Sequence, residues 1–447
     1  MNLLHALRLD ASPTSAPIIS IVGAGGKTTA LFQLAREFLA VKNKKVFVSA
    51  STHLGAWQTT HVDHHVIFKD IMSLEMDTAG LDGVILITGE INKDRTQPLT
   101  PIALKWLREK SKDQNIPLLI EADGARGHSL KAPAEHEPPI PEFSDSVIYI
   151  AGMSAIGKTL IDENVHRAEI YSQLSNLPVG HIVTSESMVA MLRHPQGGLK
   201  NITTSMRHIA FLNQADSPTL QALGGNMARA LLNDFDSVTV GSLKNGVFQT
   251  LEHTAGVILA AGQSTRYGSP KQLLDWHGKP FVRHIAETAL QSGLWPVVVV
   301  TGAYHSEIES CLTDLPVKVV QNVNYVQGQS TSIQAGLREL TEKNGACIFL
   351  LADQPQIQAE VIRALIEAHS RELSPIIAPL VLEERRANPV LFDKVTFPDL
   401  LELKGDVGGR VIFSKYKVEY LPWHDDSLLL DVDKPEDYQR LVEDETL

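Results

Sequence analysis

The sequence predicts an α/β protein made of two Rossmann-like domains with mostly parallel sheets. Short apolar runs rich in Val and Ile alternate with longer amphipathic segments along the chain. This alternation is typical of parallel strands that are buried on both faces and linked by helices. Two strand–glycine–helix openings, at 18–29 and 256–274, each resemble the start of a nucleotide-binding fold. Because more than one domain length separates them, we expect one in each of two domains.

The expected elements fall into two groups. The expected strands are 18–22, 45–49, 84–88, 117–120 and 147–151, followed by 256–260, 296–301, 318–321 and 347–351. Segments 29–41 and 281–292 have helical periodicity. Polar residues, Gly and Asn gather at 242–256, so we place the boundary there, with domains at 1–250 and 251–447.

Composition limits the classes of protein that the chain can be. Of its 447 residues, 43% are hydrophobic and 21% are charged, which is enough to build ordinary cores. The formal net charge of -12 argues against a nucleic-acid binder with a broad basic surface. The two cysteines, Cys311 and Cys347, provide no disulfide framework, and no apolar stretch reaches membrane-spanning length. We expect a cytoplasmic protein that binds neither nucleic acid nor membrane.

The first glycine loop, GAGGKTT, follows an apolar strand and predicts a P-loop-like phosphate site. Backbone N–H groups at Gly23, Gly25 and Gly26 are expected to converge on phosphate oxygens. Lys27 would reach the β- and γ-phosphates, and Thr28 or Thr29 would place a hydroxyl on Mg²⁺. The early glycine of a complete Walker A motif is replaced by Ile21, so the loop is a shortened variant. The alternative is a turn that only lets strand and helix pack closely.

Acidic and amide side chains after later strands fit the same site. Glu121 and Asp123 follow an apolar strand, where a carboxylate would hold Mg²⁺ through water; a capping aspartate before a turn is the alternative. Asn213 and Asp216 have the N-x-x-D spacing that reads guanine in GTPases, although a plain strand-to-loop turn explains it equally well. Two interpretations remain open for four histidines: a metal site, or solvated loop residues. They are His53, His61, His64 and His65.

Three motifs of this half resemble the selenium-dependent hydroxylase accessory protein family. They are GAGGKTT, EADGARGHSLKAPAEHEPPIP at 121–141 and GKTLIDENVHRAE at 157–169, and the resemblance covers about 16–241. It implies ATP or GTP binding in a maturation context. It also implies that Lys131, His136, His166 and Arg167 line the same cleft.

The second glycine loop, GVILAAGQSTRYGSPKQLL, predicts nucleotidyl transfer. In that reaction negative charge builds on the α-phosphoryl oxygens and on the departing pyrophosphate. Arg266 would clamp the β- and γ-phosphates and Lys271 would reach the α-phosphate. A solvated loop with two ordinary cations is the alternative. The other nucleotide-binding residues expected in this half are Ala260, Ala261, Gly262, Ser264, Gly268, Ser330 and Thr331.

Downstream segments contain the candidate residues for binding the metal ion and the acceptor substrate. Three aspartates that follow apolar runs are the expected Mg²⁺ ligands: Asp353, Asp431 and Asp433. The alternative is a turn residue for Asp353 and a helix cap for the later pair. In GQSTSIQAGL, residues 330–332 are expected to cap a helix whose N-terminus faces the base or ribose. Asn388 and Arg410 are candidate ligands for an anionic acceptor, although a loop salt bridge explains Arg410 equally well.

Together these motifs resemble the molybdenum cofactor cytidylyltransferase family. LAAG-x-S-x-R-x-G-x-x-K, GQSTSIQAGL, ADQP, NPVLF, GD-x-G-x-R and DVDKPED occur in family order over about 255–441. The related guanylyltransferases usually read LAGG where this chain has LAAG, which favours cytosine. The chain has Tyr267 where the family commonly has Met, and Asn388 where it has His. Neither change removes a charged catalytic group, and Asn388 is the one expected to alter contact with the pterin.

The resemblance implies that the second domain transfers CMP from CTP to Mo-molybdopterin and releases pyrophosphate. The product, molybdopterin cytosine dinucleotide, serves molybdenum hydroxylases, so an apo-hydroxylase is the expected partner. One alternative is a guanylyltransferase or another nucleotidyltransferase for a small metabolite. The other is a carrier or insertion chaperone that binds the finished cofactor without turnover.

Overall fold

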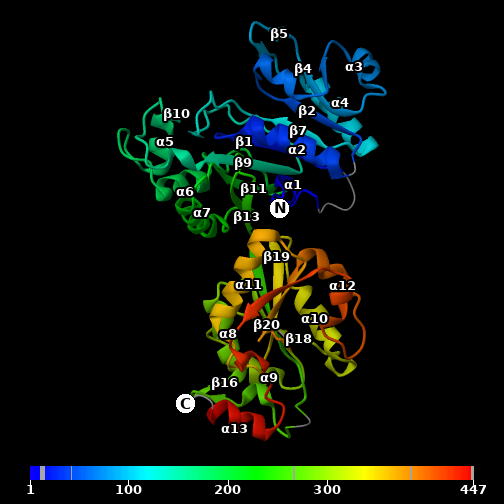
Figure 1. Cartoon of the computed structure of the whole chain (residues 1–447), viewed down its shortest axis with the longest axis vertical. Coiled ribbons are helices and arrows are strands. Elements are labelled where there is room, and N and C mark those ends of the chain that lie inside the picture. The colour runs from blue at the N-terminus through cyan, green and yellow to red at the C-terminus, as the bar shows by residue number, and fades with distance from the viewer. Residues whose placement is uncertain (11–15, 42, 265–266, 383–384, 444–447) are drawn as a thin grey trace. The chain divides into compact units, whose positions relative to one another are not determined.

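The computed structural model describes residues 1–10, 16–41, 43–264, 267–382 and 385–443. The chain forms two compact units, Met1–Leu251 (unit 1) and Glu252–Leu447 (unit 2), drawn in blue to green and in green to red (Figure 1). The boundary expected from the sequence lies next to this division.

Unit 1 is built on a nine-stranded sheet in the order β13-β12-β11-β9-β1-β7-β2-β4-β3. All neighbouring pairs are parallel except β12 with β13. The strands are β1 (Ile18–Gly23), β2 (Lys45–Ala50), β3 (His64–Ile67), β4 (Gly83–Thr88), β7 (Leu118–Glu121), β9 (Ser146–Gly152), β11 (Arg207–Asn213), β12 (Ser237–Ser242) and β13 (Val247–Leu251). Two small pairs lie outside the sheet: β5 (Ile91–Asn92) with β6 (Arg95–Thr96), and β8 (Leu130–Lys131) with β10 (Val165–His166).

Helices cover both faces of this sheet (Figure 1). The helices are α1 (Leu3–Ala6), α2 (Lys27–Val41), α3 (Ile71–Thr78), α4 (Pro101–Gln114), α5 (Ala168–Ser175), α6 (Ser185–Arg193) and α7 (Pro218–Leu231). Alternate residues of a strand point to opposite faces. Ile150 and Phe211 therefore pack with α1 and α2, whereas Tyr149 and Leu212 pack with α5–α7.

Unit 2 is built on an eight-stranded mixed sheet in the order β18-β17-β14-β19-β22-β20-β21, with β23 also pairing with β20. The strands are β14 (His253–Ala260), β17 (Val297–Thr301), β18 (Lys318–Gln321), β19 (Asn344–Leu351), β20 (Ile376–Val381), β21 (Arg385–Arg386), β22 (Val390–Asp393) and β23 (Val418–Trp423). A short pair, β15 (Asp275–Trp276) and β16 (Lys279–Pro280), precedes α8. The helices are α8 (Phe281–Gln291), α9 (His305–Ser310), α10 (Gln329–Leu337), α11 (Ala359–Glu372), α12 (Phe397–Leu401) and α13 (Pro435–Glu443).

The central strands of unit 2 are parallel and buried, and helices cover both of their faces (Figure 1). Helices α8, α9 and α11 pack on one face, and α10 and α12 pack on the other. The predicted α/β class with mostly parallel sheets is confirmed, and every expected strand is present. Across the residues described, no helix combines the length and the apolar character needed to cross a membrane.

Each unit has its own hydrophobic core, so a core truncation should act locally. Phe211 is fully buried in unit 1, where its ring lies 6.0 Å from that of Phe248. We predict that Phe211→Ala costs about 3–5 kcal/mol, because it removes apolar contacts and leaves a cavity. Hydrogen exchange with mass spectrometry should show faster exchange in β1, β9 and β11 and unchanged exchange in β14 and β19. Equal loss of protection in both units would contradict separate cores.

Candidate functional site

A cavity of 440 Å³ lies in unit 2, where segments that follow the buried strands β14 and β19 come together. Ligands of open α/β sheets bind at the carboxyl ends of their parallel strands. The residues that line the cavity are Leu259, Ala261, Gly262, Ser264, Tyr267, Lys271, Gln272, Tyr325, Gly328, Gln329, Ser332, Leu351, Ala352, Asp353, Asp406 and Asp433.

The ammonium group of Lys271 joins two carboxylates that are far apart in sequence. Its Nζ lies 2.9 Å from Asp353 Oδ2 and 2.7 Å from Asp433 Oδ1. Burial lowers the pKa of Lys271, but the two carboxylates outweigh burial and raise it, so the side chain is a fixed positive charge. Lys271, one of the two predicted cations, therefore lies together with two of the three predicted carboxylates.

The third carboxylate has a different partner. Asp431 Oδ1 accepts a hydrogen bond from Gln354 Nε2 at 2.5 Å, and Asp431 is not among the lining residues. Partial desolvation and the negative charge of Asp353 raise the pKa of Asp431, with a further contribution from Asp433. Negative charge thus accumulates here beyond what Lys271 neutralises, which favours binding of a further cation.

The loop after β14 is braced by side chains. Ser264 Oγ accepts from the N–H of Lys271 at 3.0 Å, and Gln272 Nε2 donates to Gly262 O at 2.9 Å. Gln272 is buried and was not identified from the sequence, because its role depends on how the loop folds back. The two side chains hold the start of the loop and Lys271 beside the same cavity.

The predicted capping of α10 by residues 330–332 is wrong. Gly328 is the N-cap residue, and a Cβ there would clash with the backbone of Gly405. The N–H of Gln329 instead donates to Asp406 Oδ1 at 3.1 Å, a carboxylate that sequence analysis missed. Ser330 Oγ donates to Gly405 O at 2.7 Å, so its hydroxyl is used within the protein. Ser332 lines the cavity, whereas Ser330 and Thr331 do not.

The remaining predicted residues of unit 2 are placed as follows. Ala261, Gly262 and Ser264 line the cavity; Ala260 is buried at the end of β14 and Gly268 is outside the lining. Arg410 donates to Asn388 Oδ1 at 3.2 Å, away from the lining residues. Arg266 lies outside the described residues.

A larger cavity of 810 Å³ lies in unit 1. Of the predicted residues, Gly25, Gly26, Lys27, Thr28, Thr29 and Glu121 line it, as do His136, His166 and Arg167. Gly23, Asp123 and Lys131 are not in the lining. Asp123 and Lys131 are almost fully buried behind the lining. Their ion pairs connect Lys27 with Glu137, and both of these residues line the cavity.

The phosphate-binding amides expected at Gly23 and Gly25 are engaged within the protein, which corrects that expectation. The N–H of Gly23 donates to Asp123 Oδ2 at 3.1 Å, and that of Gly25 donates to His128 O at 3.1 Å. Both glycines have positive φ, and a Cβ at Gly25 would come within 2.6 Å of Gly152. The N–H groups that begin α2, from Gly26 onward, remain the candidate anion cradle, because a first helical turn has no intrahelical acceptors.

Lys27 and Thr28 both reach the acidic strand end of β7. Lys27 Nζ donates to Gly23 O at 2.8 Å and lies 3.3 Å from Asp123 Oδ1. Thr28 Oγ1 donates to Glu121 Oε2 at 3.0 Å. Burial raises the pKa of Glu121 despite nearby Lys27, so this carboxyl group would gain from a further cation.

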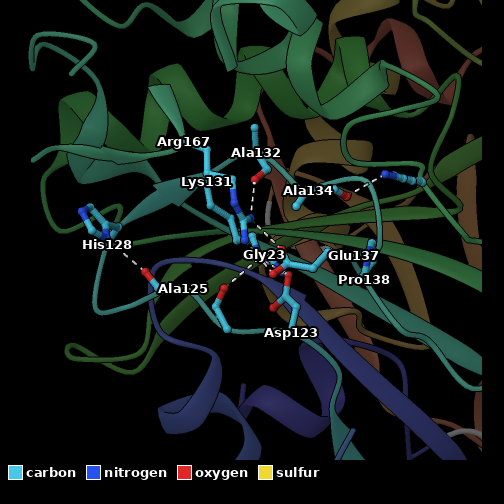
Figure 2. Close-up of polar contacts among 12 residues, drawn as sticks. Gly23, Asp123, Ala125, His128, Lys131, Ala132, Ala134, Glu137, Pro138 and Arg167 are labelled. Carbon is cyan, nitrogen blue, oxygen red and sulfur yellow. Dashed lines mark hydrogen bonds and ion pairs between the residues drawn. The ribbon is translucent and has the colours of Figure 1, made fainter. Parts of the chain in front are cut away.

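A chain of ion pairs extends from Lys27 across the site. Asp123 bridges Lys27 and Lys131, and Lys131 Nζ lies 2.8 Å from both Asp123 Oδ2 and Glu137 Oε2. Arg167 grips Glu137 with two hydrogen bonds of 2.7 Å. Figure 2 shows Arg167 and Lys131 reaching the carboxylates of Glu137 and Asp123.

The structure shows the contacts of Asn213 and of two histidines from the possible metal site. Asn213 Nδ2 donates to Gly25 O at 2.7 Å, so Asn213 braces the glycine loop. His53 contacts Thr96 O at 2.9 Å and His65 contacts Thr88 Oγ1 at 2.9 Å. Within the described part of the chain, no three His, Cys, Asp or Glu side chains are grouped as a metal site.

Unit 2 matches a family of nucleotidyltransferase domains. The MobA-like NTP transferase domain model matches residues 256–420, and the YqeC protein model matches residues 19–169. The chain belongs to the YqeC family through unit 1 and to the MobA-like NTP transferases through unit 2.

Three relatives illustrate these similarities. Uncharacterized protein YqeC of Escherichia coli is 36% identical over 213 residues, which is 47% of this chain and 80% of that protein. Nicotine blue oxidoreductase of Paenarthrobacter nicotinovorans is 32% identical over 197 residues, covering 42% of this chain and 95% of that protein. A probable molybdenum cofactor guanylyltransferase of Bacillus cereus is 31% identical over 140 residues, covering 31% of this chain and 66% of that protein.

The ion-pair chain of unit 1 predicts a pH dependence of stability. Burial opposes ionisation of Glu137, but Arg167 and Lys131 lower its pKa to about 2, from 4.5. The stabilisation from Glu137 is therefore complete above about pH 4.5 and is lost as the pH falls toward 2.

We predict that Glu137→Gln destabilises unit 1 by about 3 kcal/mol at neutral pH, because it leaves buried cations without their partner. The advantage of the wild type over Glu137→Gln, measured as a difference in melting temperature, should shrink as the pH falls from 4.5 to 2. The exposed Glu109→Gln variant is the control and should follow the wild type. A difference that stays constant over this range would contradict the assignment.

Proposed function

We propose that unit 2 transfers CMP from CTP to the terminal phosphate of Mo-molybdopterin and releases pyrophosphate. The observation that carries the proposal is the convergence of Lys271, Asp353 and Asp433 on one cavity of the MobA-like domain. LAAG at 259–262, rather than LAGG, favours cytosine.

The reaction requires positioning and charge neutralisation more than a strong base. An acceptor phosphate oxygen attacks the α-phosphorus of CTP, and the bond to the β-phosphate oxygen breaks with its electrons going to pyrophosphate. In this proposal Lys271 exchanges its contact with Asp353 for one with the α-phosphoryl oxygens, where charge develops. The positively charged Lys271 needs no proton transfer to do so.

Asp353 and Asp433 fit a magnesium ion. Both contact the same ammonium group, so their oxygens lie close together, and Mg²⁺ is commonly held by one or two carboxylates plus substrate phosphates. Bound there, Mg²⁺ would neutralise phosphate charge. The raised pKa of neighbouring Asp431 indicates the same need for a cation.

A second candidate for unit 2 is guanylyl transfer, favoured by the similarity to the Bacillus cereus protein named as a probable molybdenum cofactor guanylyltransferase. The transfer chemistry is the same and only the base differs. A non-catalytic carrier would also bind the cofactor, but it has no need for Lys271 between two carboxylates. The apo-hydroxylase partner belongs to this proposal as the recipient of the product.

We also propose that unit 1 binds ATP or GTP at α2, with the phosphates on the N–H groups from Gly26 onward. Thr28 and Glu121 would hold Mg²⁺, because a hydroxyl and an ionisable carboxyl group already meet there at 3.0 Å. The fusion to unit 2 supports a role in cofactor maturation.

Substitutions at the cavity of unit 2 test the transfer reaction. With labelled CTP, Mg²⁺ and Mo-molybdopterin, Lys271→Ala and Asp353→Asn should each lower the rate of dinucleotide formation at least about 100-fold, because charge stabilisation is lost. Lys415→Ala, which removes a surface pair with Asp399 outside the cavity, should leave the rate unchanged. Near-wild-type turnover by folded Lys271→Ala would refute the assignment.

Binding stoichiometry tests unit 1 separately. Equilibrium dialysis with ATP or GTP should show that Lys27→Ala loses one nucleotide equivalent, because the α2 site loses its lysine. CMP transfer by this variant should be unchanged, and Lys69→Ala is a matched exposed control. An unchanged stoichiometry in Lys27→Ala would contradict nucleotide binding at this loop.

A further inference from the structure

The cavity of unit 1 has anion-binding groups that are separate from the start of α2. Arg126 and His128 come from the loop after β7, and His166 and Arg167 come from β10 and the start of α5. All four line the cavity, and we call them the basic wall. The cavity is near the upper end of the roughly 300–1,000 Å³ range of small-molecule sites, so it has room for more than one group of a ligand.

The charge balance of the wall leaves Arg126 in excess. Arg167 of the wall and the ion-pair chain that continues behind it contain three cations and three carboxylates, which balance: Lys27, Lys131 and Arg167 with Glu121, Asp123 and Glu137. Arg126 is exposed and makes no hydrogen bond or ion pair with any residue that the structure describes. An uncompensated guanidinium group at the surface of a cavity favours an anionic ligand.

The two histidines of the wall add a fixed ring surface and a hydrogen-bond donor rather than charge. Their rings stack, with centroids 5.5 Å apart and planes 22° apart. The ring nitrogens of His128 lie 3.1 Å from Ala125 O and 2.8 Å from Asp162 O, which fixes the ring in place. Burial, followed by the positive charges of Arg167, Lys131 and Arg126, lowers the pKa of His166 to about 4. Its ring is therefore neutral near pH 7 and has one N–H to donate.

The wall adjoins the glycine loop without being part of it. His128 O accepts from the N–H of Gly25 at 3.1 Å, so the loop after β7 contacts the glycine loop through the backbone. An anion on the wall would therefore lie in the same cavity as phosphates bound at α2. Two ligands held in this way would lie side by side, which favours a reaction between them.

We propose that the basic wall binds a second small-molecule ligand through a phosphate or carboxylate group, beside a nucleotide held at α2. That this ligand is a second one rests on the proposed nucleotide site of unit 1. The anion would be held by Arg126, which has no carboxylate partner, and by the ring N–H of His166 beside it. The cavity is then a two-ligand site.

The test uses the full chain and inorganic phosphate as the probe. Equilibrium dialysis with labelled phosphate is done with and without saturating Mg²⁺ and a non-hydrolysable ATP analogue. We expect one phosphate equivalent to remain bound in the presence of the analogue. Arg126→Gln and His166→Gln should each weaken that binding at least tenfold, and Arg126→Lys should restore part of it. Arg229→Gln, on α7 and outside the cavity, is the matched control.

The outcomes separate the proposals. Displacement of all phosphate by the analogue would show that the wall holds the nucleotide's own phosphates and would overturn a second ligand. Phosphate binding that is unchanged in Arg126→Gln would overturn the wall itself. If the analogue does not bind but Arg126→Gln still weakens phosphate binding, the nucleotide proposal fails and the wall stands. Competition by acetate as strong as by phosphate would assign a carboxylate ligand, and weak competition would assign a phosphorylated one.

Discussion

The ion pairs of Lys271 with Asp353 and Asp433 are the interaction on which the account of unit 2 depends. These three residues come from the loop after β14, the segment that directly follows β19 and the segment before α13. Parallel strands bring such distant segments to one edge of the sheet. Without a ligand, the single ammonium group reduces the repulsion between two carboxylates and leaves one negative charge unbalanced. A nucleotide and a metal ion would divide these charges between them, which makes the resting ion pairs a preformed template for phosphate and cation.

Unit 1 applies the same principle with more burial. Lys27, Asp123, Lys131, Glu137 and Arg167 form one continuous chain of charges, and Lys131 is only 1% exposed. Burying charges is unfavourable unless each one is paired, so the chain fixes the positions of the glycine loop, the loop after β7 and the start of α5 together. In both units, charged side chains gather at one edge of the sheet and ion pairs hold them in place.

The sequence predicted what depends on local pattern. Buried Val- and Ile-rich runs marked the parallel strands, and the strand-end rule brought Asp353 to the cavity beside Lys271. Prediction from the sequence failed where the hydrogen-bond partner of a group comes from a distant segment. Gly23 and Gly25 looked like phosphate ligands, but Asp123 and His128, about a hundred residues away, take their N–H groups. Residues 330–332 looked like helix caps, but Gly328 starts α10 and Asp406 takes the N–H of Gln329. Arg126 has no local signal at all, because its importance comes from the balanced charges around it.

Pyrophosphate release from each of the four nucleoside triphosphates, with Mg²⁺ and Mo-molybdopterin, is the most direct test of the central claim. If unit 2 is the proposed cytidylyltransferase, pyrophosphate is released with CTP alone, and only when the acceptor is present. Acceptor-dependent release with GTP alone would contradict the proposed base and keep the transfer chemistry of Lys271 and its carboxylates. No release with any nucleotide, despite binding of Mo-molybdopterin, would contradict the transferase account and favour a carrier.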